Sequence, residues 1–99
     1  MIPLDKENRL ALNLIQALLG APSRNFRRIG LRVEEESVGI QIILAEESDR
    51  DREEIADVIL AFEALQQGPV PIELQVLIHA GDLREIAIHP RAVYLRRED

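Results

Sequence analysis

Residues 48–65, SDRDREEIADVILAFEAL, contain the clearest secondary-structure signal in the chain. Ser48 has the chemistry of a helix N-cap, and Asp51, three residues later, is its expected capping-box partner. Carboxylates crowd the first turns, where the helix dipole stabilises negative charge. The apolar positions that recur at helical spacing are Ile55, Val58, Ile59, Phe62 and Leu65. We therefore expect an amphipathic helix that stops at Gly68-Pro69, with Leu60 on the face opposite the core.

The N-terminal segment predicts another helix, from about residue 5 to residue 19. Asp5 is expected to cap it, and Gly20 with Pro22 ends it. Its apolar stripe is formed by Leu10, Ala11, Leu14, Ile15 and Leu18. Leu12 and Leu19 widen this stripe beyond the width that one sheet face covers. Two explanations stay open: deeper burial under a neighbouring loop, or contact with a dimer partner.

Strand patterns flank the central helix. Residues 28–33 and 38–45 alternate apolar side chains with polar, small or further apolar ones. The acidic turn 34–37 between them predicts a β-hairpin. Residues 70–79 predict a third, longer strand, because Pro71 is tolerated near its start.

The C-terminal part of the chain is less regular. A turn at 80–82 precedes two segments with strand character, 83–89 and 92–96, and either fits as the last strand. The predicted order is αββαββ, with a fifth short strand as an alternative. Two helices on one face of a mainly antiparallel sheet give a two-layer α+β sandwich, and we expect residues 1–99 to form a single domain. The other sheet face is expected to be a mixed surface, open to water or a partner, with Arg28, Arg32, Gln41, Ile43, Gln75, Leu77 and His79.

Charge is unevenly distributed along the sequence. Residues 34–57 contain ten acidic residues and two arginines, a net charge of −8, whereas the whole chain carries −6 and the remainder therefore +2. Such an acidic segment attracts a basic partner and repels nucleic acid. Cysteine is absent, which excludes disulfides and thiolate chemistry. The sequence has neither a signal-peptide pattern nor an apolar stretch of membrane-spanning length, so we expect a cytoplasmic protein with no membrane partner.

The side chains do not suggest an enzyme site. The serines lie at loop, turn or cap positions, and the sequence contains no Gly-x-Ser-x-Gly elbow. His79 and His89 flank Asp82 and Glu85, and a tight turn would bring His79 close to Glu85. This spacing matches no familiar metal site. We therefore expect no metal, no cofactor and no enzymatic activity.

A basic cluster near the first predicted strand is the main argument for nucleic-acid binding. It comprises Arg24, Arg27, Arg28 and Arg32, with Phe26 among them. Such a cluster could follow a phosphate backbone and offer one ring for stacking. The alternative is that these arginines pair with acids from neighbouring strands. Because the net charge has the wrong sign for nucleic acid, we expect no nucleic-acid partner and no attraction to anionic membranes.

A protein partner fits the charge pattern better. An acidic rim around a few exposed apolar residues is what a polar-rimmed interface needs. The candidate partner-binding residues are Glu46, Glu47, Asp49, Asp51, Glu53, Glu54 and Asp57, with Leu60 as an apolar anchor. The alternative is a charged helix face that only meets water, as most charge runs do.

Residues 46–66 resemble the central helix of small acidic bacterial proteins that act as immunity proteins in toxin–immunity systems, and the closing AVYLRR of residues 92–97 adds to the resemblance. The resemblance implies a non-enzymatic inhibitor that binds a cognate toxin and masks a basic surface on it. A different class of function stays open beside it, an acidic secretion chaperone or a homodimeric adaptor that uses the wide apolar face of the first helix and an exposed strand edge.

Overall fold

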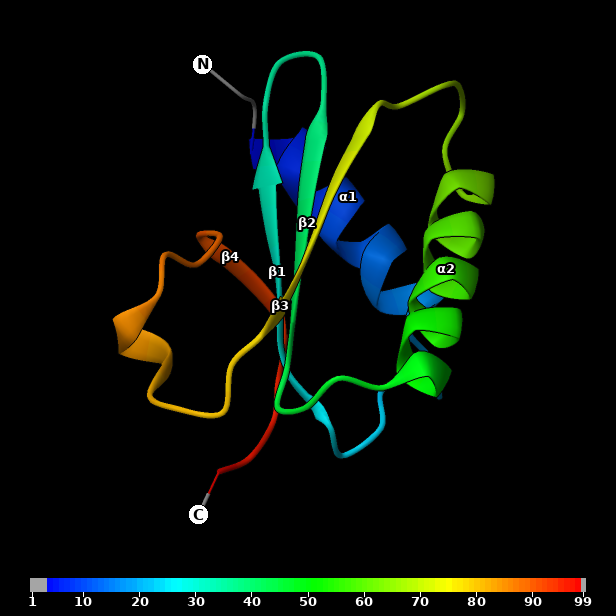
Figure 1. The fold of residues 1–99 in the computed structure, drawn as a ribbon. Coiled ribbons are helices and arrows are strands. Elements are labelled where there is room, and N and C mark those ends of the chain that lie inside the picture. The colour runs from blue at the N-terminus through cyan, green and yellow to red at the C-terminus, as the bar shows by residue number, and fades with distance from the viewer. Residues whose placement is uncertain (1–3, 99) are drawn as a thin grey trace.

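The computed structural model describes residues 4–98 and contains two helices, four strands and one short 3-10 helix. Their order and bounds are α1 (Leu4–Ala17), β1 (Phe26–Val33), β2 (Val38–Leu44), α2 (Asp49–Ala64), β3 (Ile72–Ile78), η1 (Leu83–Glu85) and β4 (Arg91–Leu95). This confirms the predicted α+β class and αββαββ order. Figure 1 shows the sheet nearly edge-on, with both helices on one side and η1 on the other.

The sheet is mostly antiparallel, with strand order β3-β2-β1-β4. β1 pairs antiparallel with β2 through the predicted hairpin, and antiparallel with β4 on its other side. β2 and β3 run parallel, because α2 connects them as a crossover. The two central strands β1 and β2 are therefore the most deeply buried elements, and β3 and β4 form the edges.

The core lies between the helices and one face of the sheet. Leu14 of α1 and Phe62 of α2 are completely buried and belong to the same apolar cluster as Ile29 and Ile42 of the central strands. α1 and α2 also pack against each other. The apolar faces predicted from helical spacing are therefore the faces that hold the two layers together.

α1 differs from its prediction at its start and in the exposure of several apolar side chains. It begins at Leu4, so Asp5 lies within the first turn rather than at the cap. Ile15, assigned to the core, is 42% exposed. Leu12 and Leu19 are 66% and 78% exposed, so the explanation that a loop of this chain buries them is wrong. Beyond the helix, Gly20 adopts a φ of 79°, the left-handed conformation that ends many helices.

The last strand is β4, so of the two candidate segments 92–96 forms the strand and 83–89 does not. Residues 83–85 form η1, whose N-cap Asp82 makes a complete capping box with Glu85. Ile86 and Ile88 follow in an extended segment with no strand beside it. The two-residue alternation of these isoleucines is that of extended backbone, which does not by itself specify a strand partner.

Residues 79–90, which we call the strap, cover the sheet face that was expected to be open. Gln41 of β2 is 1% exposed because its amide nitrogen donates to Ala87 O (2.9 Å), while its amide oxygen accepts from His89 N (3.0 Å). The His89 ring lies against Gly39, where a Cβ would come within 3.0 Å of His89 Nε2. Ile43, on the same face, is completely buried. The chain itself therefore fills the centre of the predicted mixed surface.

Candidate functional site

The predicted partner-binding residues gather at and around the first half of α2. Ser48 is the N-cap, as predicted, and its Oγ accepts a hydrogen bond from Asp51 N (3.1 Å). We call the surface carboxylates of this region, with the leucine that follows them, the acidic face: Glu46, Glu47, Asp49, Glu53, Glu54, Asp57 and Leu60. Steps of three and four residues place Asp49, Glu53, Asp57 and Leu60 along one stripe of the helix.

The acidic face is open to solvent. Glu54 is half-buried, and its other members are exposed, with Leu60 at 66%. Ala56 and Ala64 are exposed on the same stripe as Leu60, and Glu63 lies beside them. Ala56, Leu60 and Ala64 therefore form a short apolar strip on the helix surface, with carboxylates around it. Ala64 was expected beside Leu60, whereas Ala56 was not, although it also lies four residues from Leu60.

The chain's own cations neutralise little of this charge. Within residues 4–98, Glu47 is the only member of the acidic face in an ion pair; it pairs with Arg52 (Nη2 to Oε2, 2.8 Å). The hydrogen bond from Arg52 holds the pKa of the Glu47 carboxyl below its ordinary value. Six carboxylates thus face two guanidiniums, those of Arg50 and Arg52, which leaves a net charge of −4. The concentration of negative charge predicted from the sequence persists on the folded surface.

Asp51 has a different environment from the other candidate residues. Its side chain is only 6% exposed. One carboxylate oxygen accepts from Ser23 Oγ (3.0 Å) and the other from Asn25 Nδ2 (2.9 Å). The carboxylate therefore ties the start of α2 to the loop before β1, rather than completing the predicted capping box or adding to the exposed charge. Asp51 lies four residues before the buried Ile55, so the helical spacing contained this signal.

The fold buries three members of the basic cluster considered for nucleic-acid binding, whereas Arg24 and Arg32 are exposed. Phe26 is completely buried, so its ring is not available to stack on a base. A β-bulge at Arg27 lets Phe26 enter the core while Arg27 and Arg28 both leave it. The Arg27 guanidinium pairs with Glu98 (Nε to Oε2, 2.8 Å) and donates to His79 O and Gly81 O. The alternative of internal pairing is confirmed for Arg27, with an acid from the C-terminal segment.

Arg28 is buried without such a partner. It is 6% exposed, and within residues 4–98 its Nη1 has no hydrogen-bond partner. Burial lowers the pKa of this guanidinium. A cation enclosed in this way is not free to follow a phosphate backbone.

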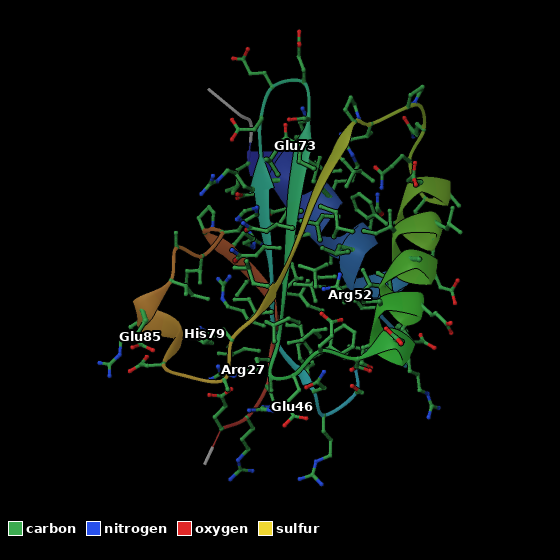
Figure 2. The ribbon with its side chains drawn as sticks, viewed as in Figure 1. Arg27, Glu46, Arg52, Glu73, His79 and Glu85 are labelled. Carbon is green, nitrogen blue, oxygen red and sulfur yellow. The ribbon has the colours of Figure 1, made fainter. Side chains whose placement is uncertain are left out.

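The histidine and acid group at the end of β3 has a structural role. His79 Nε2 lies 3.3 Å from Glu85 Oε1 and 3.0 Å from Asp82 O, as the predicted tight turn required. Figure 2 shows His79 and Glu85 together beside η1. Within residues 4–98 no group of three or more histidine and carboxylate side chains is arranged to hold a metal ion. These contacts shape the first turn of the strap.

Comparison with known proteins identifies the family of this chain. The family model of MafI2 immunity proteins matches residues 7–98, almost the whole chain and all of the acidic face. The chain belongs to the MafI2 immunity protein family. A search of curated proteins finds no significant match.

Membership of the MafI2 family confirms the resemblance noted in residues 46–66 and 92–97. A MafI2 immunity protein belongs to a bacterial toxin–immunity system, and its role is to inhibit a cognate toxin, MafB, rather than to catalyse a reaction. The expected protein partner is therefore that toxin. Neither helix of the described residues is long and apolar enough to cross a membrane.

Proposed function

We propose that this MafI2 immunity protein inhibits its toxin by covering a basic surface of the toxin with the acidic face of α2. The observation that carries the proposal is the arrangement of that face: six surface carboxylates, of which five form no ion pair within residues 4–98, border a strip formed by Leu60, Ala56 and Ala64. Charge of one sign on one side of a small protein accelerates encounter with a surface of opposite sign.

The two parts of the face have different tasks in this proposal. The carboxylates steer the toxin and take the place of the phosphates that a basic active-site surface would bind, as in a nuclease. Leu60 and the alanines form the centre from which water is expelled, where most binding energy of an interface is concentrated. Asp51 is outside this surface and supports it by fixing the start of the helix.

The test is the association rate of the purified protein with an inactive form of its cognate toxin domain. The double variant Glu53→Lys/Asp57→Lys is expected to slow association about tenfold or more at low salt, and the difference is expected to shrink as salt screens the charges. The matched control is Glu34→Lys/Glu36→Lys in the β1–β2 turn, which lies at the opposite end of the sheet from the first turns of α2 (Figure 1). Both double variants change the net charge from −6 to −2.

Equal association rates for the two double variants would refute a specific role of the acidic face and leave only a net-charge effect. Far-UV circular dichroism of both variants checks that the fold is retained. A further variant, Leu60→Ala, is expected to raise the dissociation rate with little change in association, because it removes apolar contact without charge.

The exposed side of α1 favours a second candidate function, the homodimeric adaptor or secretion chaperone. Leu4, Leu12, Ile15 and Leu19 lie on one face of this segment and are each at least 42% exposed. Sedimentation velocity of the pure protein separates the candidates, since a stable dimer favours the adaptor and a monomer the inhibitor. The cytoplasmic location expected from the sequence remains a prediction.

A further inference from the structure

The edge strand β3 presents a continuous row of unpaired backbone groups. Val38 N donates to Pro71 O (2.9 Å) at one end of the parallel pair, and His79 N donates to Leu44 O (2.9 Å) at the other. In a parallel pair this pattern turns the odd-numbered residues of β3 toward β2. The residues that direct their N–H and C=O outward are Ile72, Leu74, Val76 and Ile78. Within residues 4–98, none of these eight groups has a hydrogen-bond partner.

The two edges of the sheet differ in how well they are protected. β4 has five residues, and its register against β1 shifts at a bulge between the pairs Ile29↔Tyr94 and Gly30↔Ala92. Short length and bulges are devices that prevent unwanted strand pairing. β3 has seven residues in unbroken register, with no proline and no lysine, and Glu73 is its only charged residue. Of the two edges, β3 is the one that can accept another strand.

Exposed apolar side chains accompany this edge. Leu74 and Ile78 are 44% and 41% exposed although they lie on the helix side of the sheet. α2 turns its Asp57 and Ala61 flank toward the end of α1, where these residues line a shared hollow. Helical geometry therefore places the opposite flank, which carries Glu63, on the β3 side. A strand added to β3 would cover the two apolar side chains on this side of the sheet.

We propose that the β3 edge receives an extended segment of the cognate toxin as a fifth strand of the sheet. This inference rests on the proposed function, which supplies a basic partner, and it adds the place where that partner's backbone is held. The segment is expected to alternate apolar residues toward Leu74 and Ile78 with polar residues on the other face, where a base would meet Glu73. A second copy of this chain fits less well, because a two-fold axis would bring together two acidic molecules and duplicate the carboxylates of Glu63 and Glu73.

Amide hydrogen exchange, followed residue by residue by NMR, tests this placement. In the free protein, the amides of Leu74, Val76 and Ile78 are expected to exchange much faster than those of Gln75 and Leu77, which bond to β2. On binding the inactive toxin domain, the three outward amides are expected to slow by about tenfold or more, while the two inward amides change little. The same strand thus supplies its own control.

Two variants at one position separate backbone pairing from side-chain contact. Leu74→Pro removes an outward donor without breaking a bond to β2, whereas Leu74→Ala removes the side chain and keeps the donor. Leu74→Pro is expected to speed dissociation from the toxin several-fold beyond Leu74→Ala, with similar association rates. If Leu74→Pro fails to fold, the exchange pattern of the natural chain still tests whether the toxin pairs with β3.

The outcomes distinguish this inference from the proposed function. A complex in which Leu74, Val76 and Ile78 stay unprotected would overturn the edge proposal and leave the acidic face intact. Alternating protection together with unchanged association of Glu53→Lys/Asp57→Lys would support the edge and refute electrostatic masking. Alternating protection that grows with concentration in the free protein would assign the edge to a second copy, and the lack of any complex would overturn both proposals.

Discussion

Replacing Asp51 with alanine separates the two environments that acidic residues occupy at the start of α2. Asp51 accepts hydrogen bonds from Ser23 and Asn25 and is 6% exposed, whereas Asp49, two residues earlier, is exposed. Asp51→Ala and Asp49→Ala each remove one negative charge from the first turn, so the loss of favourable interaction with the helix dipole is similar in the two variants. The difference between them therefore reports the buried hydrogen bonds.

The expected magnitude follows from the partners that are left behind. A hydrogen bond to a charged group contributes about 1.5–3 kcal/mol. Ser23 is exposed and Asn25 Nδ2 keeps its bond to Glu46 O (2.7 Å), so neither donor becomes an orphan. The loss for Asp51→Ala then lies near the lower end for two bonds, about 3 kcal/mol. Asp49→Ala is expected to cost about 0.5 kcal/mol or less.

Urea unfolding followed by far-UV circular dichroism measures the difference, since the chain has no tryptophan to serve as a fluorescent probe. Asp51→Ala is expected to lower the urea midpoint with an unchanged slope, which indicates lost stability rather than a changed unfolded state. A free energy of unfolding within about 0.5 kcal/mol of that of Asp49→Ala would refute the reasoning. Asp51 would then contribute no more than an ordinary surface carboxylate.

Two further predictions concern the other face of the sheet. The hydrogen bond from Arg27 lowers the pKa of Glu98 from 4.5 to about 2. The stabilisation that this ion pair gives the fold is therefore present above pH 4.5 and is lost as the pH falls toward 2. Glu98→Gln is expected to flatten this part of the pH dependence of the urea midpoint. Gly30→Ala places a methyl group against the Arg28 guanidinium beneath the strap and is expected to cost about 1–3 kcal/mol. Gly68→Ala, which meets nothing within 4 Å, is the control with an expected effect near zero, and thermal melts compare the two.

Most of the fold could be predicted because its local signals agree with one another. The cap at Ser48, the apolar spacing of α2 and the acidic turn of the hairpin each specify one element without help from distant residues. The strap could not be predicted in this way. Its isoleucines alternate as in a strand, and only the glutamine of β2 that binds it, Gln41, shows that it crosses the sheet instead of joining it. These contacts join residues far apart in the sequence, so the local pattern of the strap does not contain them.

In the candidate site, too, local sequence predicts some features and tertiary structure decides the others. Exposure of Leu60 followed directly from the phase of the helix, and most of the carboxylates are on the surface as expected. Asp51 does not belong to the exposed face, because its position in the helix places it on the buried side. An exposed strand edge was expected but could not be assigned to β3, because strand order decides which strand is an edge and the sequence alone left that order open.

The pairing of β1 with β4 joins two strands that lie far apart in the sequence. Arg28 aligns with Leu95, so β4 enters the sheet only after residue 95 has left the ribosome. Until then, one side of a central strand has no neighbour and the unfinished sheet offers a second edge. A chain that stops before residue 91 would carry every carboxylate of the acidic face yet lack the strand that pairs with the free side of β1.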